Sequence, residues 1–275
     1  GFVVAGREGY GPGTGGTLLV TGRDGVGSIT TGSPFSVAGN GERESAMGRT
    51  IGRVYGSEGP SNTLYGQNAG NSITTGYYNS FFGQSAGYST TGGAGNSFSG
   101  FHTGHSNTTG NDNSFFGYYA GFNNKANDNA FFGYSAGNAN TSGTYNAFFG
   151  RSAGAANTTA SSNSFFGYQA GLVSTGSGNA FMGTRAGDAN TTGTNNDFFG
   201  FDTGGSNTTG SGNSFFGDWA GKANTTGSEN SFFGREAGSS NTTENANSSF
   251  GSYSDTAAGI TNATAIGYRA KVTQS

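Results

Sequence analysis

The segment Asn113-Ser-Phe-Phe-Gly-Tyr-Tyr-Ala-Gly121 recurs as Asn163-Ser-Phe-Phe-Gly-Tyr-Gln-Ala-Gly171 and as Asn213-Ser-Phe-Phe-Gly-Asp-Trp-Ala-Gly221. Related units fill the chain from about residue 61 onward, and each has a glycine directly after its aromatic pair. That glycine recurs every 16 or 17 residues through thirteen repeats, at Gly66, Gly83, Gly100, Gly117, Gly133, Gly150, Gly167, Gly183, Gly200, Gly217, Gly234, Gly251 and Gly267. Because such a unit is too short for two helices, each repeat predicts one coil of a parallel β-solenoid, with two short strands and two turns. Coils stacked about 4.8 Å apart would form a rod about 60 Å long.

The composition supports this all-β prediction. The 275 residues include 55 glycines, which weaken helix interiors and argue against an ordinary helical or α/β enzyme core. Only 3 prolines argue against collagen, and an aromatic content of 14% argues against disorder. The net charge of −3, without a basic patch, predicts no nucleic-acid partner. No apolar run reaches 18 residues, so we expect no membrane insertion by this segment, and the lack of cysteine excludes disulfides.

An asparagine stands four residues before the repeated glycine. In stacked coils these amides would form a hydrogen-bonded ladder, as stacked amides do in other repetitive β-structures. A ligand-binding row of amides is the alternative. The ladder is predicted for Asn79, Asn96, Asn113, Asn129, Asn146, Asn163, Asn179, Asn196, Asn213 and Asn230, with Asn62 and Asn247 at its ends.

The aromatic pair predicts two columns on opposite faces of one strand, because neighbouring strand residues alternate between faces. One column would fill the interior, and the other would form an outer stripe buried between symmetric copies or used for binding. As a working assignment we place the second column (Phe149, Phe166) inside and the first (Phe148, Phe165) between copies; sequence alone leaves this choice open. The pairs are Phe81 and Phe82, Phe115 and Phe116, Phe131 and Phe132, Phe148 and Phe149, Phe165 and Phe166, Phe198 and Phe199, Phe215 and Phe216, and Phe232 and Phe233.

The two residues after the repeated glycine vary most between repeats, which predicts that they face outward. They include the candidate ligand-binding residues Trp219, Asp218, Tyr118, Tyr119 and His102; His105 is three residues further on. Trp219 beside Asp218 could contact a sugar, although simple packing is the alternative. His102-x-x-His105 could hold a metal ion but lacks a third ligand, so we expect solvated turn residues and no metal site. We find no catalytic base beside a nucleophile and no cofactor motif, and we predict a non-enzymatic protein without a cofactor.

Nine asparagines begin the glycosylation sequence Asn-x-Ser/Thr. They could accept glycans in a suitable host. The alternative, which we favour, is that Asn-Thr-Thr-Gly is turn chemistry, since asparagine and glycine suit tight turns. The nine are Asn107, Asn140, Asn157, Asn190, Asn207, Asn224, Asn241, Asn247 and Asn262.

The last repeat, Ala263-Thr-Ala-Ile-Gly-Tyr-Arg-Ala270, resembles the Ala-Ile-Gly strand of trimeric autotransporter adhesin heads, and the other repeats resemble those of phage tail fibres and related trimeric surface fibres. This resemblance covers residues 61–275 and implies a left-handed parallel β-roll that assembles as a parallel homotrimer. It also implies an extracellular place, on a bacterial cell surface or a virion fibre, and attachment to host or prey cells or their glycans. Coils of 16–17 residues are longer than is usual in the family, and phenylalanine replaces its small aliphatic residues, so the coil could be wider.

Residues 1–60 do not follow the repeat and form a separate N-terminal region. We expect strands at residues 2–4 and 17–21 and degenerate coils at residues 45–48 and 54–56. This region could be a cap that shields the end of the solenoid, or a receptor-binding tip.

The leading hypothesis is therefore a stiff trimeric fibre segment that mediates attachment. A rival is an ice- or surface-binding solenoid that uses threonines such as Thr108, but the threonine row is interrupted at residues 124–126 and 173–175. A polysaccharide-degrading fibre would need paired carboxylates facing a groove, and none recur.

Overall fold

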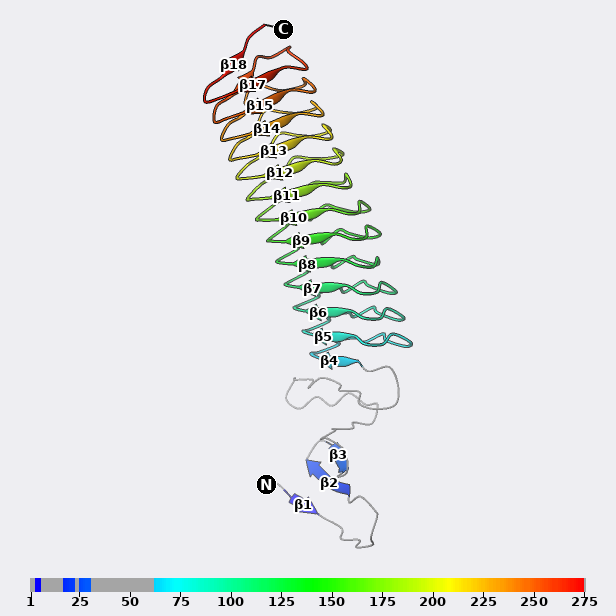
Figure 1. Ribbon diagram of the computed structural model, residues 1–275. Helices are drawn as coiled ribbons and strands as arrows, with labels where there is room; N and C mark the ends of the chain where they lie inside the picture. The colour runs from blue at the N-terminus through cyan, green and yellow to red at the C-terminus, as the bar shows by residue number, and fades with distance from the viewer. Residues whose placement is uncertain (1–2, 6–16, 23–24, 31–61, 275) are drawn as a thin grey trace.

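The computed structural model describes residues 3–5, 17–22, 25–30 and 62–274 (Figure 1), with side chains described for residues 62–274. Every regular element in these ranges is a β-strand, and no helix capable of crossing a membrane occurs among them. The repeats contribute the short strands β4 (Thr63–Tyr65), β5 (Ser80–Phe82), β6 (Ser97–Ser99), β7 (Ser114–Phe116), β8 (Ala130–Phe132), β9 (Ala147–Phe149), β10 (Ser164–Phe166), β11 (Ala180–Met182), β12 (Asp197–Phe199), β13 (Ser214–Phe216), β14 (Ser231–Phe233), β15 (Ser248–Phe250) and β17 (Thr264–Ile266).

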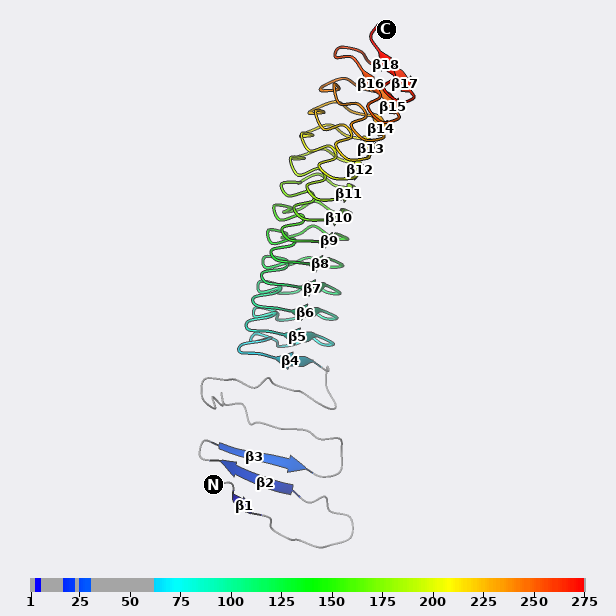
Figure 2. The same cartoon turned by 90° about the vertical axis from the view of Figure 1, so that its left-hand side faces the viewer.

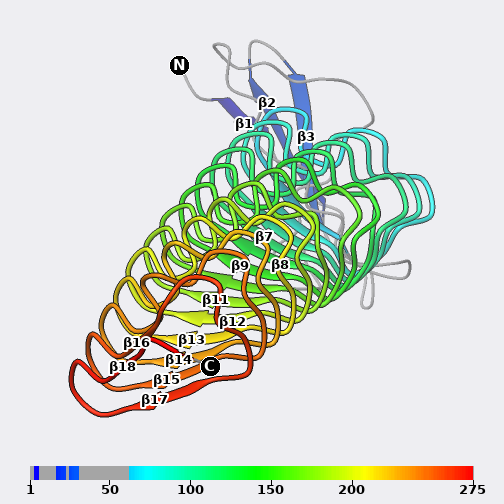
Figure 3. The ribbon, with the colours of Figure 1, turned by 90° about the horizontal axis from the view of Figure 1, so that it is seen from above.

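These strands form one 13-stranded parallel sheet in chain order, except that β16 is passed over between β15 and β17. Each strand pairs in register with the equivalent strand of the next coil, so Phe115 lies opposite Phe131 and Phe116 opposite Phe132. The coils stack into a continuous rod of about twelve turns (Figures 1 and 2), and seen from above they form nested loops, each shifted slightly from the last (Figure 3). The predicted all-β parallel solenoid is confirmed.

The predicted second strand of each coil is wrong along most of the rod. Between β4 and β15 each coil holds a single three-residue strand, and turns make up the remainder. The reason is conformational: Gly117, Tyr119 and Gly121 all have positive φ values, 135°, 58° and 57°, which interrupt an extended ladder. Single hydrogen bonds still link these turns between coils, for example from Gly121 N–H to the Ala136 carbonyl at 2.9 Å.

The first aromatic column fills the rod, which reverses our working assignment. Phe148 and Phe165 are fully buried, whereas Phe166 of the second column is 36% exposed. Buried rings stack from coil to coil with centroids 4.7 to 4.9 Å apart, from Phe81 to Phe232. Strand alternation explains the outcome, because the ladder asparagine and the first phenylalanine are two residues apart and share a face. An inward asparagine therefore requires an inward first phenylalanine.

The ladder asparagines are buried and hydrogen-bonded to backbone as well as to one another. Asn96 N–H donates to Oδ1 of Asn79 at 3.0 Å, one coil back. The Asn96 side-chain amide donates to the same oxygen at 3.0 Å and to the Gly110 carbonyl at 2.8 Å, one coil ahead. Each such amide links three coils, and its removal would leave buried backbone groups without a partner, which is costly.

A second buried asparagine column was missed by the sequence analysis. It is formed by the first residue of the Asn-Thr-Thr-Gly turns, and Asn207 exemplifies it by donating to Oδ1 of Asn190 at 2.8 Å and to the Gly210 carbonyl at 3.0 Å. The side chain thus closes its own turn and joins the preceding coil. The members, all with no exposed surface, are Asn107, Asn124, Asn140, Asn157, Asn190, Asn207, Asn224 and Asn241.

The glycine of the Ala-Gly step is required by the buried ring beside it. Gly171 has φ +56°, and a Cβ there would lie 2.5 Å from Cε2 of Phe165. The preceding residue, Ala170, is fully buried. Small residues at this step therefore let the turn close directly over the phenylalanine column.

Near its C-terminal end the rod changes its packing. Ser249 and Ala265 replace the interior phenylalanine, and β16 (Asp255–Thr256) pairs in parallel with β18 (Lys271–Val272). Glu244 is also buried here, 7% exposed. Its Oε2 accepts the N–H groups of Thr242 at 2.7 Å and Thr243 at 3.0 Å, and its Oε1 accepts that of Gly259 at 2.7 Å. Burial alone would raise the pKa of this carboxyl, but these backbone hydrogen bonds outweigh burial and lower it.

Replacing Glu244 with glutamine should destabilise this end of the rod in a pH-dependent manner. Because the folded-state pKa is lowered, the stabilisation is present above the ordinary carboxyl pKa and is lost as pH falls through the folded value. We expect E244Q to lower the free energy of unfolding by on the order of 1 kcal/mol at pH 7, measured by urea denaturation, with the difference shrinking in acid. Glu229→Gln, at an exposed carboxylate, is the control. An equal difference at neutral and acid pH would contradict this account.

Near the N-terminus, β1 (Val3–Ala5), β2 (Thr17–Gly22) and β3 (Gly25–Thr30) form an antiparallel three-stranded sheet in that order. The first two overlap the strands expected at residues 2–4 and 17–21. The degenerate coils expected at residues 45–48 and 54–56 lie outside the described residues.

Candidate functional site

The outward aromatic column is the longest apolar feature of the repeats. Phe116, Phe166 and Phe233 are 40%, 36% and 37% exposed. Consecutive rings stack with centroids 4.6 to 5.2 Å apart, and Ser99 and Met182 interrupt the stack. Soluble monomers rarely leave an apolar patch of this length uncovered. The column comprises Tyr65, Phe82, Phe116, Phe132, Phe149, Phe166, Met182, Phe199, Phe216, Phe233, Phe250 and Ile266.

The variable positions form a second exposed strip, on the turn that follows each strand. The second variable residue has φ between 53° and 60° in every coil, including bulky residues such as Tyr119 and Trp219, both at 58°. A left-handed conformation of a bulky residue commonly marks a functional site. Here Ser135 and Ser152 share it, at 53° and 57°, so it belongs to the coil. The coil thus projects any side chain from a constant place, and identity at this place is free to vary.

The structure brings His102 and His105 together within an aromatic stack. The rings of the two histidines lie 4.9 Å apart, and His105 is stacked between Tyr88 at 5.1 Å and Phe122 at 4.9 Å. Burial, and then the neighbouring His102, lower the pKa of His105, which favours its neutral form. Within the described ranges no three His, Cys, Asp or Glu side chains gather as metal ligands. The arrangement is therefore one of aromatic packing around two imidazoles.

Tyr118 belongs to a neighbouring stack that runs along the rod. Its ring lies 5.1 Å from Phe101 and 5.3 Å from Tyr134, and the Arg151 guanidinium lies 5.4 Å from the Tyr134 ring. The ring faces are occupied by one another, so their edges and hydroxyl groups are what the stack presents. Sequence periodicity could have revealed this stack, because its members occupy the same variable position.

Trp219 and Asp218 have different environments although they are adjacent. Asp218 Oδ1 accepts the N–H of Phe201, one coil back, at 2.9 Å, so this carboxylate joins coils. The Trp219 ring is flanked by two cations, the Arg235 guanidinium at 5.2 Å and the Lys222 ammonium at 5.7 Å from its centroid. Cation–π contacts of this kind hold the indole in one orientation.

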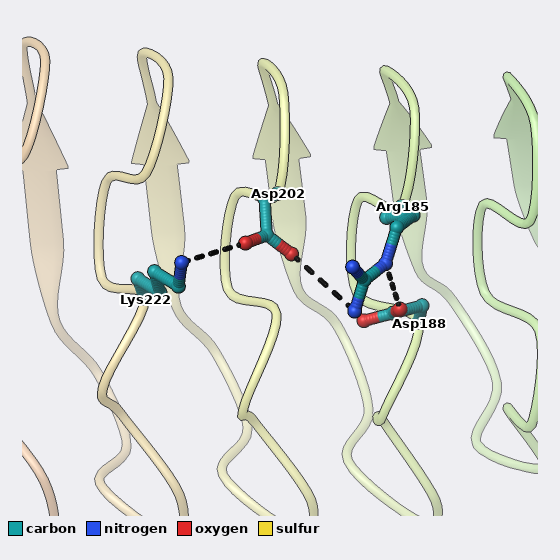
Figure 4. Close-up of polar contacts among 4 residues, drawn as sticks. All are labelled: Arg185, Asp188, Asp202 and Lys222. Atoms are coloured by element: carbon teal, nitrogen blue, oxygen red, sulfur yellow. Dashed lines mark hydrogen bonds and ion pairs between the residues drawn. The ribbon is translucent and has the colours of Figure 1, made fainter.

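A chain of charges missed by the sequence analysis leads toward Trp219 (Figure 4). Arg185 Nε lies 2.7 Å from Oδ2 of Asp188 and Lys222 Nζ lies 2.9 Å from Oδ2 of Asp202, while Arg185 and Asp202 are 3.9 Å apart. The hydrogen bond from Asp188, and then the charges of both aspartates, raise the pKa of Arg185. Spacing of one coil plus or minus three residues was the available signal. Because Asp202 is only 6% exposed and has two cationic neighbours, its charge is locally compensated.

A pocket of about 460 Å³ opens beside Trp219. It lies where the fifth residue after the repeated glycine is small: Gly205 and Ser239 occupy the positions that Tyr88, His105 and Phe122 fill in earlier coils. The pocket is lined by Ser206, Trp219, Lys222, Ala223, Glu236 and Ser239.

The glycosylation sequences are closed by the fold, except at one position. Asn262 is exposed, whereas the other eight asparagines have no exposed surface. Their amides are hydrogen-bonded inside the rod, as Asn140 shows by donating to the Gly143 carbonyl at 2.9 Å. The folded chain therefore presents only Asn262 of these nine to a glycosylating enzyme.

The repeated threonines lie in turns and use their hydroxyl groups between coils. Thr91 Oγ1 donates to the Thr108 carbonyl at 3.1 Å, and Thr208 Oγ1 donates to the Thr225 carbonyl at 3.0 Å. No described strand carries this row. The geometry thus gives the ice-binding hypothesis no flat strand face of free hydroxyls.

Comparison of the chain with protein-family models, with curated proteins and with solved structures gives no match. Inference about function therefore rests on the residues and geometry above.

Proposed function

We propose that the chain is a rod segment of a non-enzymatic trimeric fibre, in which about thirteen left-handed coils of each copy stack in parallel with those of two others. The fibre stands outside the cell, on a bacterial surface or a virion, and attaches to host or prey cells or their surface glycans. The observation that carries the proposal is the outward aromatic column. Threefold order, handedness and attachment follow from the resemblance to trimeric adhesin heads and tail fibres.

A second copy of this chain is the partner that best matches the column. Its rings recur at the coil spacing, and only a surface with the same repeat can meet every ring along the rod. Each outward ring is already more than half buried by its neighbours, so covering the remainder contributes less than about 1 kcal/mol per coil. Over the whole column this sums to on the order of 10 kcal/mol, comparable with the cost of association. Association thus requires the full length of the rod.

The variable strip supplies the features expected of an attachment surface. It carries exposed aromatic rings such as Tyr118, Tyr134 and Tyr168, and it shares no residue with the outward column. Pairing through the column therefore does not consume the strip. Stacking of coils along the rod provides the stiffness that a spacer needs.

Light scattering coupled to gel filtration tests this proposal. One chain has a mass of 27.6 kDa, so a trimer has a mass of about 83 kDa. We expect a trimer for the wild-type chain and a monomer for the double variant Phe149→Ser with Phe166→Ser, because two polar residues interrupt the column at its centre.

Tyr168→Ser is the matched control, because it removes an exposed aromatic ring outside the column. We expect it to remain trimeric. A monomeric wild type, or a trimer that survives the double substitution, would overturn the proposed assembly. Binding of labelled protein to whole cells then tests attachment, and saccharide cleavage by the purified chain would contradict the non-enzymatic assignment.

A further inference from the structure

We infer that the pocket beside Trp219 binds an uncharged glycosyl residue, a neutral hexose or N-acetylhexosamine unit of a surface glycan. This inference rests on the proposed role in attachment and names the sugar class and the place of contact. The observations that carry it are the space itself, the mixture of apolar and polar walls, and the compensation of nearby charges.

The space is produced by small residues in a column that is otherwise filled. In earlier coils Tyr88, His105 and Phe122 stack at this position, whereas Gly205 and Ser239 leave it open on either side of Lys222. The resulting volume of about 460 Å³ lies within the range of small-ligand pockets. The opening spans three successive coils, as a sugar with its neighbouring glycosyl unit would require.

The walls have the mixed chemistry of a sugar site. The Trp219 indole provides an apolar wall for the C–H groups of a pyranose ring. Glu236 provides carboxylate oxygens that accept hydrogen bonds from vicinal hydroxyl groups, and Ser206 and Ser239 provide hydroxyls that donate or accept. Lys222 adds a donor at the same pocket. A purely apolar ligand would leave these polar groups without partners.

The charges around the pocket favour an uncharged sugar over an acidic one. Lys222 is paired with Asp202 at 2.9 Å, and Arg235 lies 3.6 Å from Glu236. Neither cation is therefore free to compensate a carboxylate on the ligand. A sialic or uronic acid would in addition approach Glu236, and this like-charge contact is unfavourable.

The pocket is organised before any ligand binds. Arg235 and Lys222 flank the indole, and the Phe201 ring contacts it edge-on at 5.8 Å. A wall held from several sides loses little conformational freedom on binding, which favours affinity.

Intrinsic fluorescence tests the inference directly, because Trp219 is the single tryptophan among 275 residues. We expect a saturable change in emission on titration with lactose, mannotriose or N,N′,N″-triacetylchitotriose. For 3′-sialyllactose we expect at least about tenfold weaker binding, as follows from one unfavourable contact of about 1.4 kcal/mol.

Ser239→Phe should abolish the fluorescence response, because it restores the aromatic residue that the equivalent position has in Phe122 and so fills the pocket. Ala155→Phe places the same ring in the same column remote from the pocket, and we expect wild-type binding. Far-ultraviolet circular dichroism confirms that both variants fold.

The possible results separate this inference from the proposed function. No response to any neutral sugar, or tighter binding of 3′-sialyllactose, would overturn the inference. Unchanged binding by folded Ser239→Phe would also overturn it. The trimer and its attachment to cells could each persist in all three cases, because mass and whole-cell binding are measured separately. A monomeric chain that gives the expected sugar response would instead contradict the proposed assembly and support the pocket.

Discussion

Phe148→Ser should destabilise the rod by at least about 4 kcal/mol. Removing a fully buried phenyl ring costs about 3–5 kcal/mol, and the serine hydroxyl adds a buried polar group without an evident partner. Phe148 has no exposed surface and stacks on Phe131 at 4.9 Å and Phe165 at 4.8 Å, so both neighbouring coils lose their contact. Urea denaturation followed by circular dichroism measures the loss.

The adjacent Phe149→Ser is the matched control, because the same chemical change is made on the opposite face of the same strand. Its ring is partly exposed, so we expect less than about 1 kcal/mol of lost stability within one chain. Dilution below the association limit separates this effect from loss of assembly. Equal losses for the two variants, at a concentration where the chain is monomeric, would show that the two faces are not distinct.

Gly200→Ala should separate two coils and lower the free energy of unfolding by about 4 kcal/mol, the sum of backbone strain and overpacking. Gly200 has φ +142°, and a Cβ there would lie 2.6 Å from the carbonyl oxygen of Gly217 and 2.6 Å from Oγ1 of Thr203. The carbonyl belongs to the next coil, and it cannot move without stretching the coil-to-coil hydrogen bonds. Chemical denaturation and proteolysis at the middle of the rod would both report the change.

Gly267→Ala separates these two causes. Gly267 occupies the equivalent position near the C-terminal end, with φ +118°, and a Cβ there would meet nothing within 4 Å. Only the backbone strain remains, so we expect a loss of about 1–3 kcal/mol. If both alanine variants lose the same stability, close coil stacking is not what requires glycine in the middle of the rod.

Much of the architecture could be predicted because it repeats. A regular interval between glycines requires that each coil repeats the last, and Asn79, Asn96 and Asn113 therefore fall into one column whatever the shape of the coil. The all-β class, the parallel pairing and the outward variable residues follow from the same regularity. One further inference was available but not drawn: an inward Asn113 requires an inward Phe115, because they are two residues apart on one strand.

Other features could not be read from local pattern. Asn207 heads a sequence that is typical of an exposed turn, yet it is fully buried, because the turn folds its amide inward to bond Gly210 and the preceding coil. The predicted second strand is absent because positive φ values end the ladder. Both outcomes depend on the path of the backbone around the coil, which residue preferences constrain only weakly.

The candidate site illustrates the same division. Trp219 and His102 could be selected from sequence as chemically capable residues at outward positions. The stack around His105 and the pocket around Trp219 could not, because they depend on which side chains meet across successive coils.

The sequence by itself determined the repeat, the all-β class and the columns, because a fixed interval in the chain becomes a fixed direction in a stack. Only the tertiary structure decided which phenylalanine is buried, which turn asparagines point inward, and where a pocket opens. Those outcomes depend on the closing of the coil, which brings residues far apart in the unit, such as Phe165 and Gly171, into contact. They also depend on the stacking of unequal side chains from one coil to the next.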